Sequence, residues 1–172
     1  MRYLTMLLML VLAGCAYQTG FRSPELSLQD VGVVAVVPFE NLSGYPDAGI
    51  IVAELFQANL SASGAVRLAT PEVVKKKMES LEGKTASVQE LGEALGAQML
   101  VLGRVTEYTY KHTLGMDPAV GISVRLVDAQ TGRVFWHQAR SQTGRYSCIK
   151  QDCLSRLAQV VCDNLVKSLL EE

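Results

Sequence analysis

The sequence predicts an α/β fold in which a central mixed sheet is flanked by helices and ends in a C-terminal antiparallel meander. Residues 31–39 are a valine-rich run, which is typical of a strand covered on both faces. Apolar residues recur at helical spacing in 51–60 and again in 154–169, so amphipathic helices should pack against this strand. Residues 120–127 and 133–141 predict two further strands joined by a short turn.

Three helices are expected before the second buried strand, at residues 46–60, 71–82 and 88–95. Pro46 has the fixed φ of a first helical position, and Thr70 before Pro71 is a good N-cap. Residues 87–90 read SVQE, in which the serine and glutamate form a capping box. Gly96 should end that short helix.

The remaining elements are strands and one long helix. A short strand is expected at 66–69 and a buried one at 98–104, after which polar and aromatic residues alternate over 105–111. Residues 128–132 read DAQTG and should connect the last two strands as a hairpin. A long amphipathic helix over 152–170 closes the core.

Composition limits the possible functions. The 172 residues include 16 Lys and Arg against 17 Asp and Glu, for a formal net charge of −1. Nucleic-acid binding rests on a broad basic surface, so no nucleic-acid partner is expected. The longest apolar run, Leu4 to Ala13, is shorter than the roughly 18 residues that a membrane-spanning helix needs.

The first fifteen residues resemble a bacterial lipoprotein signal. Arg2 precedes a Leu- and Met-rich stretch that ends in LAGC at positions 12–15, which is similar to the lipobox. Residues 1–14 are therefore predicted to be a signal peptide, and Cys15 is predicted to carry the lipid. Several acyl chains on one cysteine would hold the protein durably in its leaflet.

The residues after Cys15 indicate the compartment. Lipoproteins kept in the inner membrane usually have Asp in the second place after the cysteine, and Tyr17 stands there, so we expect the periplasmic face of the outer membrane. Residues 15–30 lack an apolar period and are interpreted as a lipidated tether of up to about 50 Å. Residues 31–172 are then a single periplasmic domain.

No motif of an enzyme, a cofactor site or a metal site is found. His112 and His137 have no cysteine or carboxylate at a spacing that would orient them as base or ligand. Among the cysteines, Cys153 and Cys162 are too far apart along one helix to pair, so we expect a disulfide between Cys148 and Cys153 and a free thiol at Cys162. The sequence predicts a protein that is not an enzyme.

Two aromatic residues are candidates for contact with the membrane interface, where amphipathic rings are favoured. Trp136 lies in the last strand, and Tyr146 lies just before the final helix. The alternative for Trp136 is a half-buried residue of the sheet.

Three long segments carry a family resemblance: VVAVVPFENLSGYPDAG (33–49), GAQMLVLGRVTEYTYK (96–111) and PAVGISVRLVDAQTGRVFWHQARSQTG (118–144). They resemble the domain shared by the TolB N-terminal region, the curli secretion protein CsgG and the lipoprotein LpoB. Within this group they are most similar to the PelC-type lipoproteins of Pel exopolysaccharide export. The resemblance covers about residues 31–170.

The resemblance implies a function in export. It implies a periplasmic ring of about twelve subunits under the outer membrane, with acids that guide a cationic polysaccharide toward an outer-membrane β-barrel. Glu107, Asp117 and Asp128 are the candidate acids because they lie in the meander. By the same resemblance, Tyr146 takes the place of an aromatic that touches the membrane.

Two other functions stay open within this group. An LpoB-like activator of a penicillin-binding protein should have a long disordered linker that crosses the cell wall, and the roughly 15 residues here are short for that purpose. A CsgG-like secretion channel should contribute membrane-crossing hairpins of about 10 residues per strand. Residues 105–111 have no second strand of that kind beside them.

Overall fold

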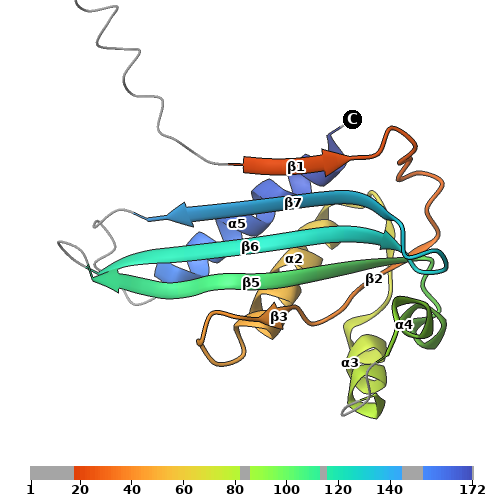
Figure 1. Cartoon of the computed structure of the whole chain (residues 1–172), viewed down its shortest axis with the longest axis horizontal. Coiled ribbons are helices and arrows are strands. Elements are labelled where there is room, and N and C mark those ends of the chain that lie inside the picture. Colours follow the sequence, from red (N-terminus) through yellow and green to blue (C-terminus); the bar gives the residue numbers. More distant parts are fainter. Residues whose placement is uncertain (1–17, 82–85, 113–115, 145–152, 172) are drawn as a thin grey trace, which may run out of the picture.

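The computed structural model describes residues 18–81, 86–112, 116–144 and 153–171 (Figure 1). In these ranges seven strands form one mixed sheet. The strands are β1 (Gln18–Arg22), β2 (Val33–Val36), β3 (Glu40–Asn41), β4 (Arg67–Leu68), β5 (Met99–His112), β6 (Met116–Asp128) and β7 (Val134–Thr143). The helices are α2 (Ala48–Ser63), α3 (Pro71–Ser80), α4 (Val88–Leu95) and α5 (Cys153–Leu170).

The sheet has the order β1-β7-β6-β5-β2-β4, with β3 paired to β5. Neighbouring strands are antiparallel from β1 through β7 and β6 to β5. The remaining pairs, β2–β5, β2–β4 and β3–β5, are parallel. The predicted fold class, a mixed sheet with a C-terminal antiparallel meander, is confirmed.

The two faces of the sheet are covered unequally. Helices α2 and α5 lie behind the long strands and bury one face in the main core, which includes Phe56, Ile122 and Leu165 (Figure 1). Helices α3 and α4 lie at the β2 end and form a smaller core around Leu100 and Val74. The rest of that second face is open to solvent, where its exposed side chains are Arg104, Thr109, Lys111, Arg125, Ser141 and Thr143.

Local signals placed the helix ends well. In the SVQE segment the Ser87 hydroxyl accepts from the Glu90 backbone N–H, and the Glu90 carboxylate accepts from the Ser87 N–H at 2.7 Å. Gly96 ends the same helix with φ of 60°. The first of the three helices starts two residues later than predicted, because Asp47 adopts a left-handed conformation with φ of 58°.

The interpretation of residues 15–30 as a tether is wrong for 18–30. Gln18–Arg22 form β1, which pairs with β7 along its whole length. Ser23 and Leu26 are buried, and the Ser23 N–H donates to the Phe135 carbonyl at 2.8 Å. This segment lacks an apolar period because β1 is an edge strand, held by backbone hydrogen bonds to β7.

The predicted loop before residue 120 is also shorter than expected. β5 and β6 pair in register as far as His112 and Met116, so they form one long hairpin. The strand pairing shifts between Val105 and Glu107, which removes Thr106 from the alternation that the sequence predicts. No helix within the described ranges is long and apolar enough to cross a membrane.

Candidate functional site

Three acidic side chains meet at the end of the sheet where β6 turns into β7, which we call the turn end. Glu25, Asp30 and Asp128 line a groove of about 350 Å³. The other residues of the lining are Leu26, Ser27, Val31, Gln98, Met99, Gln130 and Phe135. We call this the acidic groove.

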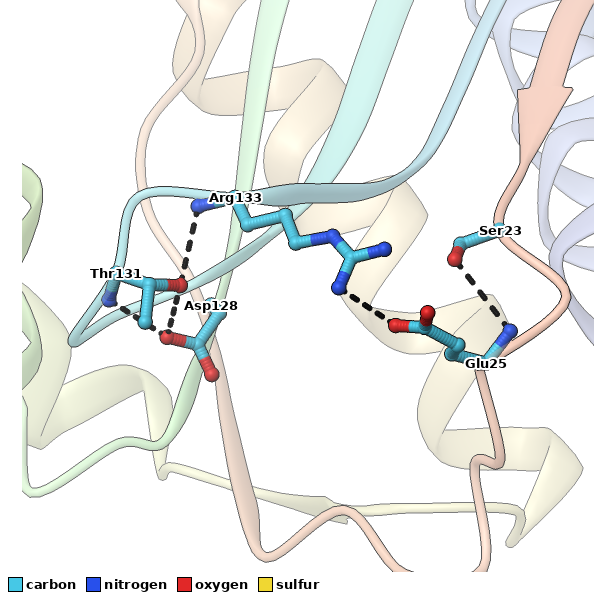
Figure 2. Close-up of polar contacts among 5 residues, drawn as sticks. All are labelled: Ser23, Glu25, Asp128, Thr131 and Arg133. Carbon is cyan, nitrogen blue, oxygen red and sulfur yellow. Dashed lines mark hydrogen bonds and ion pairs between the residues drawn. The ribbon is translucent and has the colours of Figure 1, made fainter.

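The β6–β7 turn holds Asp128 in place. Its Oδ1 atom accepts hydrogen bonds from the Thr131 backbone N–H at 2.7 Å and the Thr131 hydroxyl at 2.7 Å (Figure 2). The same atom accepts from the Gln130 N–H at 3.1 Å. Gly132 follows with φ of 71°, a conformation that glycine adopts without strain. The Arg133 N–H donates to the Thr131 hydroxyl at 3.3 Å and completes the turn.

These hydrogen bonds also fix the charge of Asp128. The bonds from the Thr131 backbone and side chain lower the pKa of this carboxyl from its ordinary value, because they stabilise the ionised form. The carboxylate therefore stays negative at any pH above the ordinary range of Asp.

The other two acids come from the segment that follows β1. The Ser23 hydroxyl accepts from the Glu25 N–H at 3.4 Å (Figure 2). The Leu26 N–H donates to the Ser23 carbonyl at 3.1 Å. With Leu26 packed into the main core, this compact turn brings Glu25 to the β6–β7 hairpin. Asp30 lies farther along the same segment, where its N–H donates to the Ser27 carbonyl at 3.4 Å.

Arg133 links the two parts of the site. Its guanidinium forms an ion pair with Glu25 (Figure 2). The same guanidinium lies 5.0 Å from the centroid of the Phe135 ring. In the described part of the chain, neither Asp30 nor Asp128 forms an ion pair. The groove therefore keeps a net negative charge, which attracts cationic groups.

The described residues do not contain a group of three His, Cys, Asp or Glu side chains that could hold a metal ion. His137 lies on the open face of the sheet, where its Nε2 atom is 3.0 Å from the Ser123 hydroxyl. No carboxylate orients this histidine among the contacts of the described ranges. The arrangement at the groove therefore suits binding of a cation by its electric field.

The structure does not bring the three predicted acids together. Asp128 lies at the turn end, whereas Asp117 lies near the other end of β6, where it is opposite Lys111 of β5. Eleven residues of extended strand separate the two acids, which corresponds to roughly 35 Å. Glu107 forms an ion pair of 2.9 Å with Lys111. Glu107 and Asp117 thus belong to a mixed-charge patch near the tip of the β5–β6 hairpin.

Trp136 is not a membrane-contacting residue. Its side chain is only 2% exposed and belongs to the main core, because this position of β7 points toward α5. The alternation along β7 could not show which face the helices cover. Cys15, Tyr146 and Cys148 lie outside the described residues, so their predicted roles stay predictions.

The two cysteines of α5 differ. Cys153 is disulfide-bonded, and Cys148 as its partner remains a prediction. Cys162 is free and fully buried, and its thiol donates to the Val52 carbonyl at 3.8 Å. Burial raises the pKa of this thiol to about 12, so it is an unreactive core residue.

Sequence reasoning missed most of the acidic groove. The sequence places Glu25 and Asp30 in the predicted tether, and Arg133 and Phe135 in the predicted strand 133–141. The acids lie far from Asp128 in the sequence, and only the pairing of β1 with β7 brings them to it. The one available signal was the high density of Ser, Pro and acidic residues in 23–30, which favours compact turns.

Comparison with known proteins gives one family and several related folds. The family model of the TolB amino-terminal domain matches residues 30–134. No curated protein matches the sequence.

Three solved structures have a fold similar to that of this chain. The match to the PelC dodecamer from Paraburkholderia phytofirmans covers 92% of this chain and 99% of the PelC chain, at 24% sequence identity and a TM-score of 0.67. The match to the lipoprotein GNA1162 from Neisseria meningitidis covers 79% of this chain and 99% of the GNA1162 chain, at 20% sequence identity and a TM-score of 0.63. The match to the LpoB C-terminal domain from Salmonella enterica covers 70% of this chain and 87% of the LpoB chain, at 15% sequence identity and a TM-score of 0.50.

At these identities the matches show the fold. The predicted resemblance is confirmed at the level of the group that contains the TolB amino-terminal domain, PelC and LpoB. None of these proteins is named for an enzymatic activity.

Proposed function

The chain belongs to the family of TolB amino-terminal domains, and from this membership we propose that it is a lipid-anchored, non-catalytic protein of the outer membrane. In this proposal it assembles as a periplasmic ring of about twelve subunits. The ring guides a Pel-like, cationic exopolysaccharide to an outer-membrane β-barrel.

The observation that carries the proposal is the extent of the likeness to PelC. The similarity takes in 92% of this chain and 99% of the dodecamer's chain, so it extends over nearly the whole length of both. The LpoB domain matches less of the chain and less closely. The lipobox at positions 12–15 supports the anchored state.

The position of β1 restricts where the domain can lie relative to the lipid. Because β1 begins at Gln18, only two residues stand between Cys15 and the sheet in the sequence. Three steps of fully extended chain span about 10 Å, so the chain allows no greater separation between Cys15 and Gln18. A lipid on Cys15 would therefore hold the domain at the membrane. A short connection argues against an LpoB-like activator, which has to reach across the cell wall.

The same register indicates which end of the sheet approaches the bilayer. Gln18 lies level with Val105 across the strands, and β5 continues for seven more residues to His112, about 23 Å. In our proposal this hairpin tip, which carries Met116 with 57% of its surface exposed, reaches the membrane interface. Near the same tip, the Gly144 N–H donates to the Pro118 carbonyl at 2.7 Å, and Tyr146 follows Gly144 by two positions in the sequence.

The acidic groove lies at the opposite end of the sheet. Asp128 pairs with Met99 at the start of β5, six residues from the level of Gln18 and on the side away from the hairpin tip. In a ring, one groove from each subunit would form a circle of negative charge that faces the periplasm. Such a field would attract and orient a polymer that bears amino groups.

Replacement of the lipidated cysteine tests this proposal. Cys15→Ser is expected to release the protein from membranes and to abolish exopolysaccharide export, while the folded chain persists in the periplasm. The measurements are membrane fractionation and the amount of secreted polymer, with wild type as reference. Normal secretion by the soluble form would contradict a function that depends on anchoring.

A further inference from the structure

Two surfaces lie at opposite edges of the sheet, and we propose that they bind each other between successive copies of this chain. One is the β1 edge with Phe21. The other is a groove between α2 and α3. This inference rests on the proposed ring, and it assigns the surfaces that would build it.

The β1 edge is suited to bind another chain. β1 is the outermost strand, since its one partner in the described sheet is β7. Phe21 stands on this edge with 53% of its surface exposed, which places it among the most exposed large apolar side chains of the described residues. The outward backbone groups of an edge strand are also available for hydrogen bonding.

The opposite edge has a matching cavity. Helices α2 and α3 lie on different faces of the sheet (Figure 1). Residues of both helices and of β2 line a groove of about 370 Å³. The groove has an apolar part and a polar part. The apolar lining consists of Val36, Pro38, Ile50, Ala53, Pro71, Val74 and Met78, and the polar lining consists of Glu54, Gln57, Lys75 and Glu79. Ile50 is 48% exposed within it, so a large apolar side chain from another molecule could fill the groove.

The two surfaces lie at the same level along the strands. One row of paired residues crosses the sheet through Arg22, Trp136, Leu126, Val101 and Val36. Arg22 is the neighbour of Phe21, and Val36 lines the groove. A second copy can therefore place its Phe21 in the groove without sliding along the strand direction.

This geometry determines the kind of assembly. A contact between two different surfaces is heterologous, so each copy offers one free surface to the next. When successive copies do not shift along the rotation axis, such contacts close into a ring, whereas a shift produces a helix. With the axis along the strands, every Gln18 lies at the same height, as a ring of lipid-anchored subunits requires.

Two variants test the contact from its two sides. Phe21→Glu removes the inserted side chain and leaves the groove intact, whereas Ile50→Glu places a charge in the groove and leaves Phe21 intact. We expect each lipidated variant, purified in detergent, to be monomeric by native mass spectrometry, while wild type forms a closed ring. Phe21→Ala and Ile50→Ala remove apolar contact without adding a charge, so each should also increase the fraction of monomer relative to wild type.

The mixture of the two variants gives the sharpest result. An equimolar mixture should form dimers with one copy of each variant and no larger species, because only one productive contact is possible. Dimer formation also shows that both variants are folded. Val160→Glu is the matched control, since Val160 is also an exposed large apolar side chain but lies on α5 and belongs to neither surface, and it should assemble like wild type.

The outcomes separate this inference from the proposed function. If wild type forms rings and either glutamate variant still forms them, the assigned surfaces are wrong and the ring stands. If the two variants remain monomeric when mixed although thermal unfolding shows both to be folded, the heterologous contact is also wrong. If wild type itself is monomeric, the proposed ring fails.

Discussion

Arg133 forms an ion pair with Glu25 that joins the β6–β7 turn to the segment after β1. Both side chains are more than half exposed, at 53% and 63%, so water and salt screen the attraction. We expect Glu25→Gln to lower the free energy of unfolding by less than about 1 kcal/mol. Urea denaturation measures this change, and a loss above about 2 kcal/mol would show that the contact is structural.

Asp128→Asn should weaken the β6–β7 turn in a pH-dependent way. Because hydrogen bonds from Thr131 lower the pKa of Asp128 in the folded state, its stabilising effect is complete above the unfolded pKa, near 4. The effect is lost as the pH falls through the lower folded pKa. The variant should lose about 1 kcal/mol at pH 7 and progressively less below pH 4. Urea denaturation over pH 2–7 tests this, and a constant difference would contradict it.

Gly49 lies where α2 meets the loop before β3, and no larger residue fits there. A Cβ atom at this position would overlap the Phe39 carbonyl, while the Phe39 N–H donates to the Gly49 carbonyl at 3.2 Å. Gly49→Ala should therefore cost about 2 kcal/mol or more of stability. Gly20→Ala is the control, since its Cβ would be 3.5 Å from the nearest atom and its effect should stay below about 0.5 kcal/mol. Equal effects of both substitutions on the thermal midpoint would refute the steric explanation.

Cys162 should resist alkylation in the native protein. Its thiol is buried, and its pKa of about 12 leaves almost no reactive thiolate at pH 8. Iodoacetamide followed by peptide mass spectrometry should label Cys162 only after denaturation. The same unreduced digest should contain a linked peptide if Cys148 is the partner of Cys153. Rapid labelling of Cys162 in the folded chain would show that α5 opens readily.

Local chemistry made part of this structure predictable from the sequence. The capping box of Ser87 and Glu90 depends on residues three positions apart, and the turn from Asp128 to Gly132 depends on residues within one hairpin. Neither needs information about distant parts of the chain. These elements were found where the sequence placed them.

Features that depend on distant partners were not predictable in this way. Gln18–Arg22 have no strand pattern of their own and become β1 only through β7. Trp136 has a strand pattern, but its burial depends on which face α5 covers. The acidic groove combines both problems, because Glu25 reaches Asp128 only after β1 has paired.

The most direct test of the account is to lengthen the connection between Cys15 and β1. A flexible insertion of about 20 residues between Tyr17 and Gln18 would leave lipidation, fold and ring contacts intact but would release the ring from its fixed distance to the bilayer. Secreted exopolysaccharide should then fall to the level of the Cys15→Ser strain, while the same insertion after Glu172 should leave secretion unchanged. Normal secretion with the lengthened connection would contradict the claim that this protein acts by holding a repeated surface at the membrane.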